Sequence, residues 1–138
     1  MPSLRHIAIA VSDPWKSAEF YEKAFGMRRV TEARASIGDA VFLTDGVMNL
    51  SLCRYNADEP AGKVGKDYVG LHHIGFWVED IDKTQADIEA AGGTFWMGEV
   101  PEDRARNVFY EVKYHDIDGV VVDITHTGWQ GAKAPEDE

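Results

Sequence analysis

An internal repeat limits the folds open to this chain more than any other feature of its sequence. When the chain is shifted by 67 positions, residues 6–13 lie on residues 73–80, with histidine on histidine at the start and aspartate on aspartate at the end. Identities continue downstream as far as Gly26 on Gly93. A fixed period of this kind sets the architecture. Because a half of about 65 residues buries too little apolar surface to be stable alone, we expect two copies that share a single core.

The first copy predicts a strand, a helix and three further strands. The opening run alternates apolar residues with small or polar ones, as a half-buried strand does. Asp13 followed by Pro14 marks a helix start, and Gly26 marks its end. The Asp-Gly pair at residues 45–46 signals a tight hairpin between two later strands. We expect a strand at 4–12, a helix from 14 to about 25, and strands near 28–35, 40–44 and 47–55.

The second copy repeats this plan. Asp80 is expected to cap a helix that runs to about Ala91. Residues 56–70 are rich in Gly and charged residues and connect the copies, while residues 99–107 form a polar loop. Strands are expected within 71–80 and near 94–97, 108–114 and 120–125. The chain therefore reads as one domain over 1–130, with repeats at about 4–55 and 72–126 and a disordered tail at 132–138.

Composition and charge exclude several classes of function. With 14 basic and 24 acidic residues, the chain has a formal charge of −10, whereas a nucleic-acid partner needs clustered Lys and Arg. No apolar stretch approaches the length of a membrane span, and the start lacks a basic region followed by an apolar run. The single cysteine, Cys53, cannot form an internal disulfide. We expect a cytoplasmic protein in a reducing compartment that binds neither nucleic acid nor membrane.

The faces of the predicted strands assign the candidate site residues. His6 and His73 lie opposite the apolar residues of their strands, and the glycine at Gly75 predicts open space beside the second imidazole. Asn49 and Glu111 lie on the corresponding faces of later strands. A lone histidine is usually a hydrogen-bonded core residue. Packing gives no reason to place an imidazole at both equivalent positions, so we interpret the pair as metal ligands.

Three motifs in the chain resemble those of a known superfamily. They are His6–Val11 with Phe20-Tyr21 and Phe25-Gly26 after it, His73–Asp80, and Asp116–Ile124. Together they resemble the vicinal oxygen chelate superfamily of glyoxalases, ring-cleaving dioxygenases, epimerases and antibiotic-resistance proteins, over about residues 4–126. The resemblance implies an α+β fold in which two βαβββ modules form an eight-stranded, partly open curved sheet with the helices outside.

The resemblance also implies a metal site and a homodimer. One divalent ion, Fe, Mn, Ni, Zn or Mg, is expected to bind His6, His73 and Asp123, the acid four residues after the glycine of the last motif. Asn49 is taken as the equivalent position in the first copy and as a possible fourth ligand. Because members commonly dimerise, a homodimer is expected. The tryptophans considered for its interface are Trp15, Trp96 and Trp129.

This ligand set predicts enzyme chemistry on a small molecule. Two imidazoles and one carboxylate leave coordination positions open, and a metal there can chelate two adjacent substrate oxygens and stabilise an enolate. Glu111 could accept the proton, although a cross-strand partner for a lysine is the more common role of such a residue. We therefore predict a metal-dependent lyase or isomerase of the glyoxalase and epimerase kind.

Three other functions stay open. The chain could be a metal-free protein that sequesters an aromatic or antibiotic-like ligand between Trp77, Phe109 and Trp96. Extradiol-type dioxygenation ranks second among the enzyme functions, and a vestigial site serving only as an interaction module is the third possibility. His72 and His115 are interpreted as surface residues and take no part in any of these functions.

Overall fold

The computed structural model describes residues 1–136, and its elements follow the predicted order of two βαβββ modules. A short helical connection separates the modules. The first module consists of β1 (Ser3–Ala10), α1 (Pro14–Phe25), β2 (Arg28–Ala35), β3 (Gly38–Thr44) and β4 (Asn49–Tyr55). The connection contains α2 (Asp58–Ala61) and the 3₁₀ turn η1 (Gly62–Val64). The second module consists of β5 (Gly70–Trp77), α3 (Ile81–Ala90), β6 (Thr94–Met97), β7 (Val112–His115) and β8 (Val121–Thr125).

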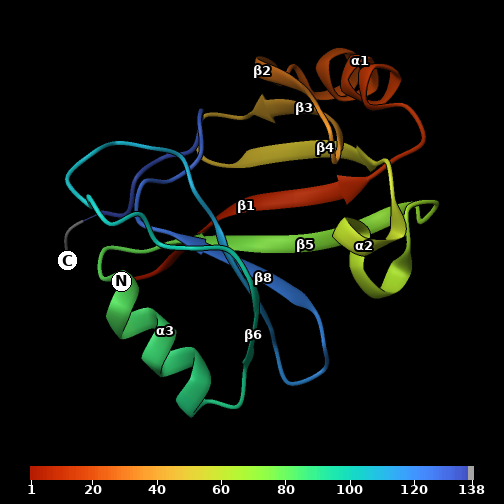
Figure 1. The fold of residues 1–138 in the computed structure, drawn as a ribbon. Coiled ribbons are helices and arrows are strands. Elements are labelled where there is room, and N and C mark those ends of the chain that lie inside the picture. The colour runs from red at the N-terminus through yellow and green to blue at the C-terminus, as the bar shows by residue number, and fades with distance from the viewer. Residues whose placement is uncertain (137–138) are drawn as a thin grey trace.

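The strands build one curved sheet (Figure 1). Within residues 1–136, it has eight strands in the order β2-β3-β4-β1-β5-β8-β7-β6, and its two edge strands are not paired with each other. Figure 1 shows α1 beside β2 and β3 at one end and α3 beside β6 at the other. The predicted α+β class and the partly open eight-stranded sheet are confirmed.

The two modules meet at the middle of the sheet, where β1 pairs antiparallel with β5. Each of these strands pairs in parallel with the last strand of its own module, β1 with β4 and β5 with β8. His6 lies opposite Gly75, and Ala8 lies opposite His73. The two histidines are therefore diagonal neighbours on one face of the sheet.

Side-chain caps begin both long helices where the sequence predicts them. The carboxylate of Asp13 accepts hydrogen bonds from the backbone N–H groups of Trp15 and Lys16, and Gly26 ends α1 in the left-handed conformation at φ 70°. Asp80 caps α3 by accepting from the N–H of Lys83. Among residues 1–136, none of the helices has both the length and the apolar character that a bilayer crossing requires.

The apolar core is divided between the modules, so the expectation of a single shared core is wrong. One cluster lies between α1 and the first module, and includes Leu43, Leu52 and Ala18. A second cluster lies beside α3, and includes Val112 and Ile124. Hydrogen bonds between β1 and β5 join the two modules, so the modules are connected by backbone pairing rather than by a shared apolar core.

The strand predicted at 108–114 is displaced toward the C-terminus. The observed β7 begins at Val112, because the preceding residues leave the sheet. The carbonyl of Val108 accepts a hydrogen bond from the hydroxyl of Thr127, and Phe109 lines a cavity. A Cβ at Gly98 would lie 2.3 Å from the carbonyl oxygen of Glu111, so this close approach favours glycine.

Candidate metal centre

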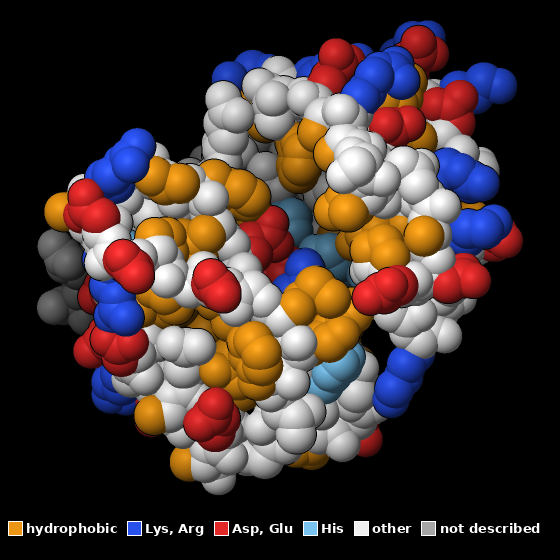
Figure 2. All heavy atoms as spheres, viewed as in Figure 1, with side chains coloured by type: hydrophobic (Ala, Val, Ile, Leu, Met, Phe, Trp, Pro, Cys, Tyr) orange, Lys and Arg blue, Asp and Glu red, His pale blue; other side chains and the backbone are white. Residues whose placement is uncertain are grey.

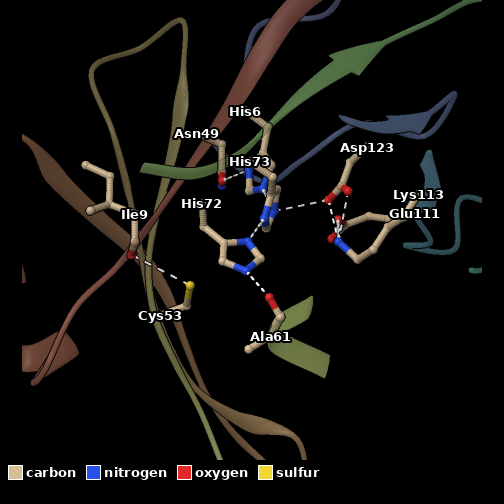
Figure 3. A network of polar contacts seen from close by, with 10 residues as sticks. All are labelled: His6, Ile9, Asn49, Cys53, Ala61, His72, His73, Glu111, Lys113 and Asp123. Atoms are coloured by element: carbon tan, nitrogen blue, oxygen red, sulfur yellow. Dashed lines mark hydrogen bonds and ion pairs between the residues drawn. The ribbon is translucent and has the colours of Figure 1, made fainter. Parts of the chain in front are cut away.

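His6 and His73 come together beside Asn49, His72 and Asp123 (Figure 3). They lie on the face of the sheet opposite Ile7, which packs in the cluster beside α1. They project from β1 and β5, and their side chains are buried, at 2% and 5% exposed. Their Nε2 atoms lie 3.3 Å apart. Small residues occupy the neighbouring positions on this face, so two imidazoles can approach this closely.

Asn49 fixes the orientation and the proton position of His6. The amide nitrogen of Asn49 donates to the carbonyl of Gln130 at 2.9 Å, so its oxygen faces His6. That oxygen lies 2.8 Å from Nδ1 of His6, which must therefore be the donor. A neutral His6 then carries its proton on Nδ1 and a free lone pair on Nε2.

His72 fixes His73 in the same tautomer. The Nε2 atom of His72 lies 2.7 Å from the carbonyl oxygen of Ala61 in α2 and donates to it. The Nδ1 atom of His72 is thus an acceptor, and Nδ1 of His73 donates to it at 2.7 Å. His73 is left with a free lone pair on Nε2. The expectation that His72 is a surface residue is wrong, because its ring packs between α2 and the site.

Two acidic side chains and one lysine complete the cluster. Asp123 of β8 is fully buried, and its Oδ2 atom lies 3.2 Å from Nε2 of His73. Lys113 of β7 donates to both oxygens of Asp123, at 2.9 and 2.8 Å. The carboxylate of Glu111 lies 3.6 Å from the same ammonium, and its side chain is 21% exposed. Glu111 faces the cavity rather than the core.

Burial sets the protonation of the cluster near neutral pH. It lowers the pKa of His6 to about 4 and holds the pKa of His73 well below its usual value. Burial raises the pKa of Glu111 to about 7, and the charge of Asp123 adds to this shift. Burial alone would lower the pKa of Lys113, but the charges of Asp123 and Glu111 outweigh burial and raise it. Both imidazoles are therefore neutral at pH 7, and Lys113 is charged.

The donor atoms fit a divalent cation. His6, His73, Glu111 and Asp123 each offer one ligand atom, and these atoms all lie within 4.8 Å of one another. Two neutral Nε2 lone pairs that face each other at 3.3 Å repel unless a cation or a proton lies between them. Neutral imidazole with carboxylate is a common donor set for divalent transition metals.

The strand register corrects the equivalence of Asn49 and Asp123. On β4, Asn49 lies opposite His6 and Ser51 lies opposite Ala8; on β8, the residue opposite Gly75 is Asp123. Because Gly75 is two residues after His73, as Ala8 is after His6, the counterpart of Asp123 is Ser51. The oxygen of Asn49 faces Nδ1 of His6, on the ring edge away from His73.

The space beside Gly75 is filled by a side chain from the segment that follows β8. The indole of Trp129 stacks on His6 with ring centroids 4.7 Å apart and an interplanar angle of 5°. A Cβ at Gly75 would lie 2.7 Å from Cη2 of Trp129. The predicted open space is therefore wrong, since the glycine makes room for an indole. Trp129 is 4% exposed and forms a wall of the site, which leaves little of it for a dimer interface.

Two cavities open on this side of the sheet. The first has a volume of about 230 Å³, and its lining includes His6, His73, Glu111 and Lys113. Figure 2 shows this face hollowed at its centre, with histidine, acidic and basic side chains at the bottom of the hollow. The second cavity has a volume of about 500 Å³, and Trp129 contributes to its wall. The candidate metal centre is therefore accessible to a small molecule from one side.

Sequence reasoning missed three residues of the site. Lys113 has the same strand parity as Glu111, so the alternation that assigned Glu111 to the site face could have found it. His72 has the opposite parity to His73, and only the position of α2 brings its ring back to the site. Trp129 follows Gly128, whose backbone at φ 76° no pattern in the sequence predicts.

Comparison with known protein families agrees with this geometry. The family model described as Glyoxalase/Bleomycin resistance protein/Dioxygenase superfamily matches residues 3–124. The chain belongs to this superfamily. The match spans both modules and includes His6, His73 and Asp123. No curated protein matches the sequence.

Several solved structures share the fold of this chain. A hypothetical protein from Bacillus halodurans C-125 is 20% identical with a TM-score of 0.69, over 99% of this chain and 98% of that one. A methylmalonyl-CoA epimerase in complex with methylmalonyl-CoA and NH4+ is also 20% identical with a TM-score of 0.69, over 90% and 93%. The methylmalonyl-CoA epimerase of Mycobacterium tuberculosis is 18% identical with a TM-score of 0.65, over 88% and 85%. At these identities the similarity establishes the fold alone.

Proposed function

We propose that this protein is a metal-dependent enzyme that acts on a small molecule with two neighbouring oxygens, by isomerase or lyase chemistry of the glyoxalase and epimerase kind. The observation that carries the proposal is the pair of Nε2 atoms of His6 and His73, 3.3 Å apart, with the carboxylate of Asp123 beside them. Both rings are held in the tautomer that a ligand needs.

In this proposal His6, His73 and Asp123 hold one divalent ion, which could be Fe, Mn, Ni, Zn or Mg. Such an ion supplies open positions for two substrate oxygens and stabilises the negative charge of an enolate. Glu111 faces the same cavity and has a pKa of about 7, so a large share of it is deprotonated at neutral pH. Its carboxylate is placed to accept a proton from the carbon beside a substrate carbonyl.

The surroundings of the site favour proton transfer in a dry pocket. Trp129 covers one side of His6, and Asp123 is fully buried, so both groups are shielded from bulk water. Exclusion of water strengthens electrostatic stabilisation of a charge that develops on the substrate. Because methylmalonyl-CoA epimerases share this fold, epimerase chemistry is the first enzyme reaction to test, and ring cleavage is the second.

Metal content and proton exchange test the proposal together. Protein purified without a histidine tag is stripped with chelator and reloaded with each candidate ion, and bound metal is measured by elemental analysis. We expect one ion per chain in the wild type and in His115→Ala, whose ring lies outside the metal cluster, and none in His73→Ala. The loaded wild type should exchange solvent deuterium into α-hydroxy or α-keto compounds, or into thioesters of substituted malonates.

Two results would overturn this function. A metal content near zero with every ion would refute the site. Metal binding without deuterium exchange, but with oxygen consumption on catechols, would favour a dioxygenase.

A second candidate is a metal-free protein that binds an aromatic ligand. It is supported by the 500 Å³ cavity, whose lining includes Trp77 and Phe109, two of the three predicted walls. Trp96 lies elsewhere, with its ring centroid 5.0 Å from that of His115. This candidate predicts ligand binding that a chelator does not change, as measured by quenching of tryptophan fluorescence.

A further inference from the structure

Lys113 is paired with Asp123, the carboxylate that a metal ion would need as a ligand. It lies directly opposite Asp123 in the pairing of β7 with β8. Its ammonium donates to both oxygens of Asp123, at 2.9 and 2.8 Å, and lies 3.6 Å from Glu111. Figure 3 shows the three side chains converging beside His73. Both oxygens of the buried carboxylate are thus already paired with a cation that belongs to the protein.

An ion bound to Asp123 would therefore meet a positive charge. Asp123 is fully buried and Lys113 is 20% exposed, so little water separates the two groups. Like charges placed together at a desolvated site oppose each other strongly. At the same time, the ammonium balances the charge of Asp123, because the nearby imidazoles are neutral and Glu111 is a second acid. Removal of Lys113 would leave a buried negative charge with no cation beside it.

We propose that Lys113 is an internal cation which holds Asp123 and Glu111 in the metal-free protein, and that a divalent ion binds by displacing its ammonium from Asp123. The inference rests on the proposed function, because it assumes that a metal binds. Lysine suits the exchange, since its charge is compact and its four-carbon stem is flexible. The side chain lines the 230 Å³ cavity, so the ammonium can withdraw into it while staying near Glu111.

If the metal ion displaces Lys113, one substitution should have opposite effects on the stability of the metal-free protein and on metal affinity. Lys113→Met keeps the bulk of the stem and removes the charge. It should lower the melting temperature of the metal-free protein, because Asp123 loses its counter-charge. It should also tighten metal binding by about tenfold or more, because the competing cation is gone. General damage to the fold would weaken both properties, so this pair of opposite effects is specific to the exchange.

Titration calorimetry of chelator-stripped protein with Zn(II), and separately with Mn(II), measures the effect. Lys113→Arg retains the charge and should show no gain in affinity. Lys83→Met is the matched control, because Lys83 pairs with Asp87 on the exposed side of α3 and its side chain is 70% exposed. Wild-type affinity in the control and a gain confined to Lys113→Met are the expected results.

The possible outcomes separate this inference from the proposed function. If wild type and Lys113→Met bind metal equally well, the exchange is overturned while the metal site stands. If only Lys113→Met binds metal, the exchange is overturned and Lys113 is a permanent replacement for the ion. If neither binds, the proposed function itself fails.

A measurement on the unaltered protein covers the case in which Lys113→Met does not fold. Reductive methylation followed by peptide mass analysis reports how accessible each lysine is. Saturation with Zn(II) should raise the modification of Lys113 severalfold and leave that of Lys83 unchanged. Equal modification of Lys113 with and without the ion would contradict its displacement.

Discussion

The two modules place an imidazole at the same position and then differ in everything that surrounds it. In the first module, the amide of Asn49 holds Nδ1 of His6; in the second, the ring of His72 holds Nδ1 of His73. The acids of the metal cluster and the lysine paired with them come from the second module, with Asp123 on β8 where the first module has Ser51 on β4. Glu111 directly precedes β7 of the second module, and Lys113 lies within it.

This difference separates geometry from chemistry. The repeat fixes where the two Nε2 atoms meet, because β1 and β5 pair about the centre of the sheet. It does not fix the charge of the site, which a single module can supply. A chain built from two copies can therefore keep a symmetric pair of ligands and still have one side of its pocket suited to proton transfer.

The largest expected effect comes from comparing substitutions of Asp123 and of its counterpart in the first module, Ser51. Asp123→Asn should abolish measurable metal binding and lower the free energy of unfolding by about 2–4 kcal/mol, because Lys113 loses its main partner. Ser51→Ala should change neither quantity appreciably. Titration calorimetry and chemical denaturation measure both variants. Equal losses in the two variants would show that the modules contribute symmetrically after all.

The next effect tests whether Glu111 acts as a base or as a ligand. Glu111→Gln should reduce deuterium exchange into the substrate by about 10²–10⁴-fold, the range for loss of a general base, while metal content stays unchanged. Glu102→Gln, on the exposed loop before it, serves as the control. A loss of metal in Glu111→Gln would instead assign Glu111 to the ligands.

Acid should destabilise the metal-free protein through both imidazoles. Burial lowers the pKa of His6 to about 4, whereas an unfolded histidine takes up its proton near pH 6.5. Between these values the unfolded chain binds more protons, so the free energy of unfolding falls as the pH drops from about 6.5 to 4. The contribution of His6 is on the order of 3 kcal/mol. Thermal unfolding of chelator-treated protein across this range measures it.

His6→Gln provides the comparison for this pH effect. The substitution removes one of the two titrating rings, so its stability should depend less steeply on pH than that of the wild type. His73 has a pKa well below its usual value and should account for the remaining slope. Identical slopes in the variant and the wild type would mean that His6 does not titrate on unfolding in this range.

The smallest effect concerns the two groups that hold the Nδ1 atoms. Asn49→Ala and His72→Ala should each weaken metal binding by about 10–100-fold, as expected when a partner that orients a ligand is lost. The fold should be retained, because neither side chain belongs to an apolar core cluster. Titration calorimetry gives the two values. If Asn49 were a direct ligand, its substitution would cost far more than that of His72.

Local patterns in the sequence predict the elements and faces of this fold well. The alternation in β1 assigns Ile7 and Ile9 to the cluster beside α1 and His6 to the opposite face, as the structure shows. The caps at Asp13 and Asp80 mark the helix starts correctly. These features depend on residues close together in the chain, where periodicity and capping act directly.

Features that depend on strand register are not predictable in the same way. Asn49 and Ser51 have the same parity on β4 and are both polar, so only the pairing with β1 decides which is the counterpart of Asp123. Likewise, nothing near Gly75 in the sequence indicates that Trp129 will fill the space beside it. These relations arise from long-range packing, which a single sequence without its pairing partners does not encode locally.

The indole stacked on His6 belongs to a segment outside the part of the chain that defines the superfamily. Trp129 and Gln130 follow residue 124, where the family match ends, and no strand contains them. Substitutions there would reshape the wall of the pocket without disturbing any ladder of the sheet. Residues 126–130 are therefore the first segment to randomise when a new specificity is sought on this scaffold.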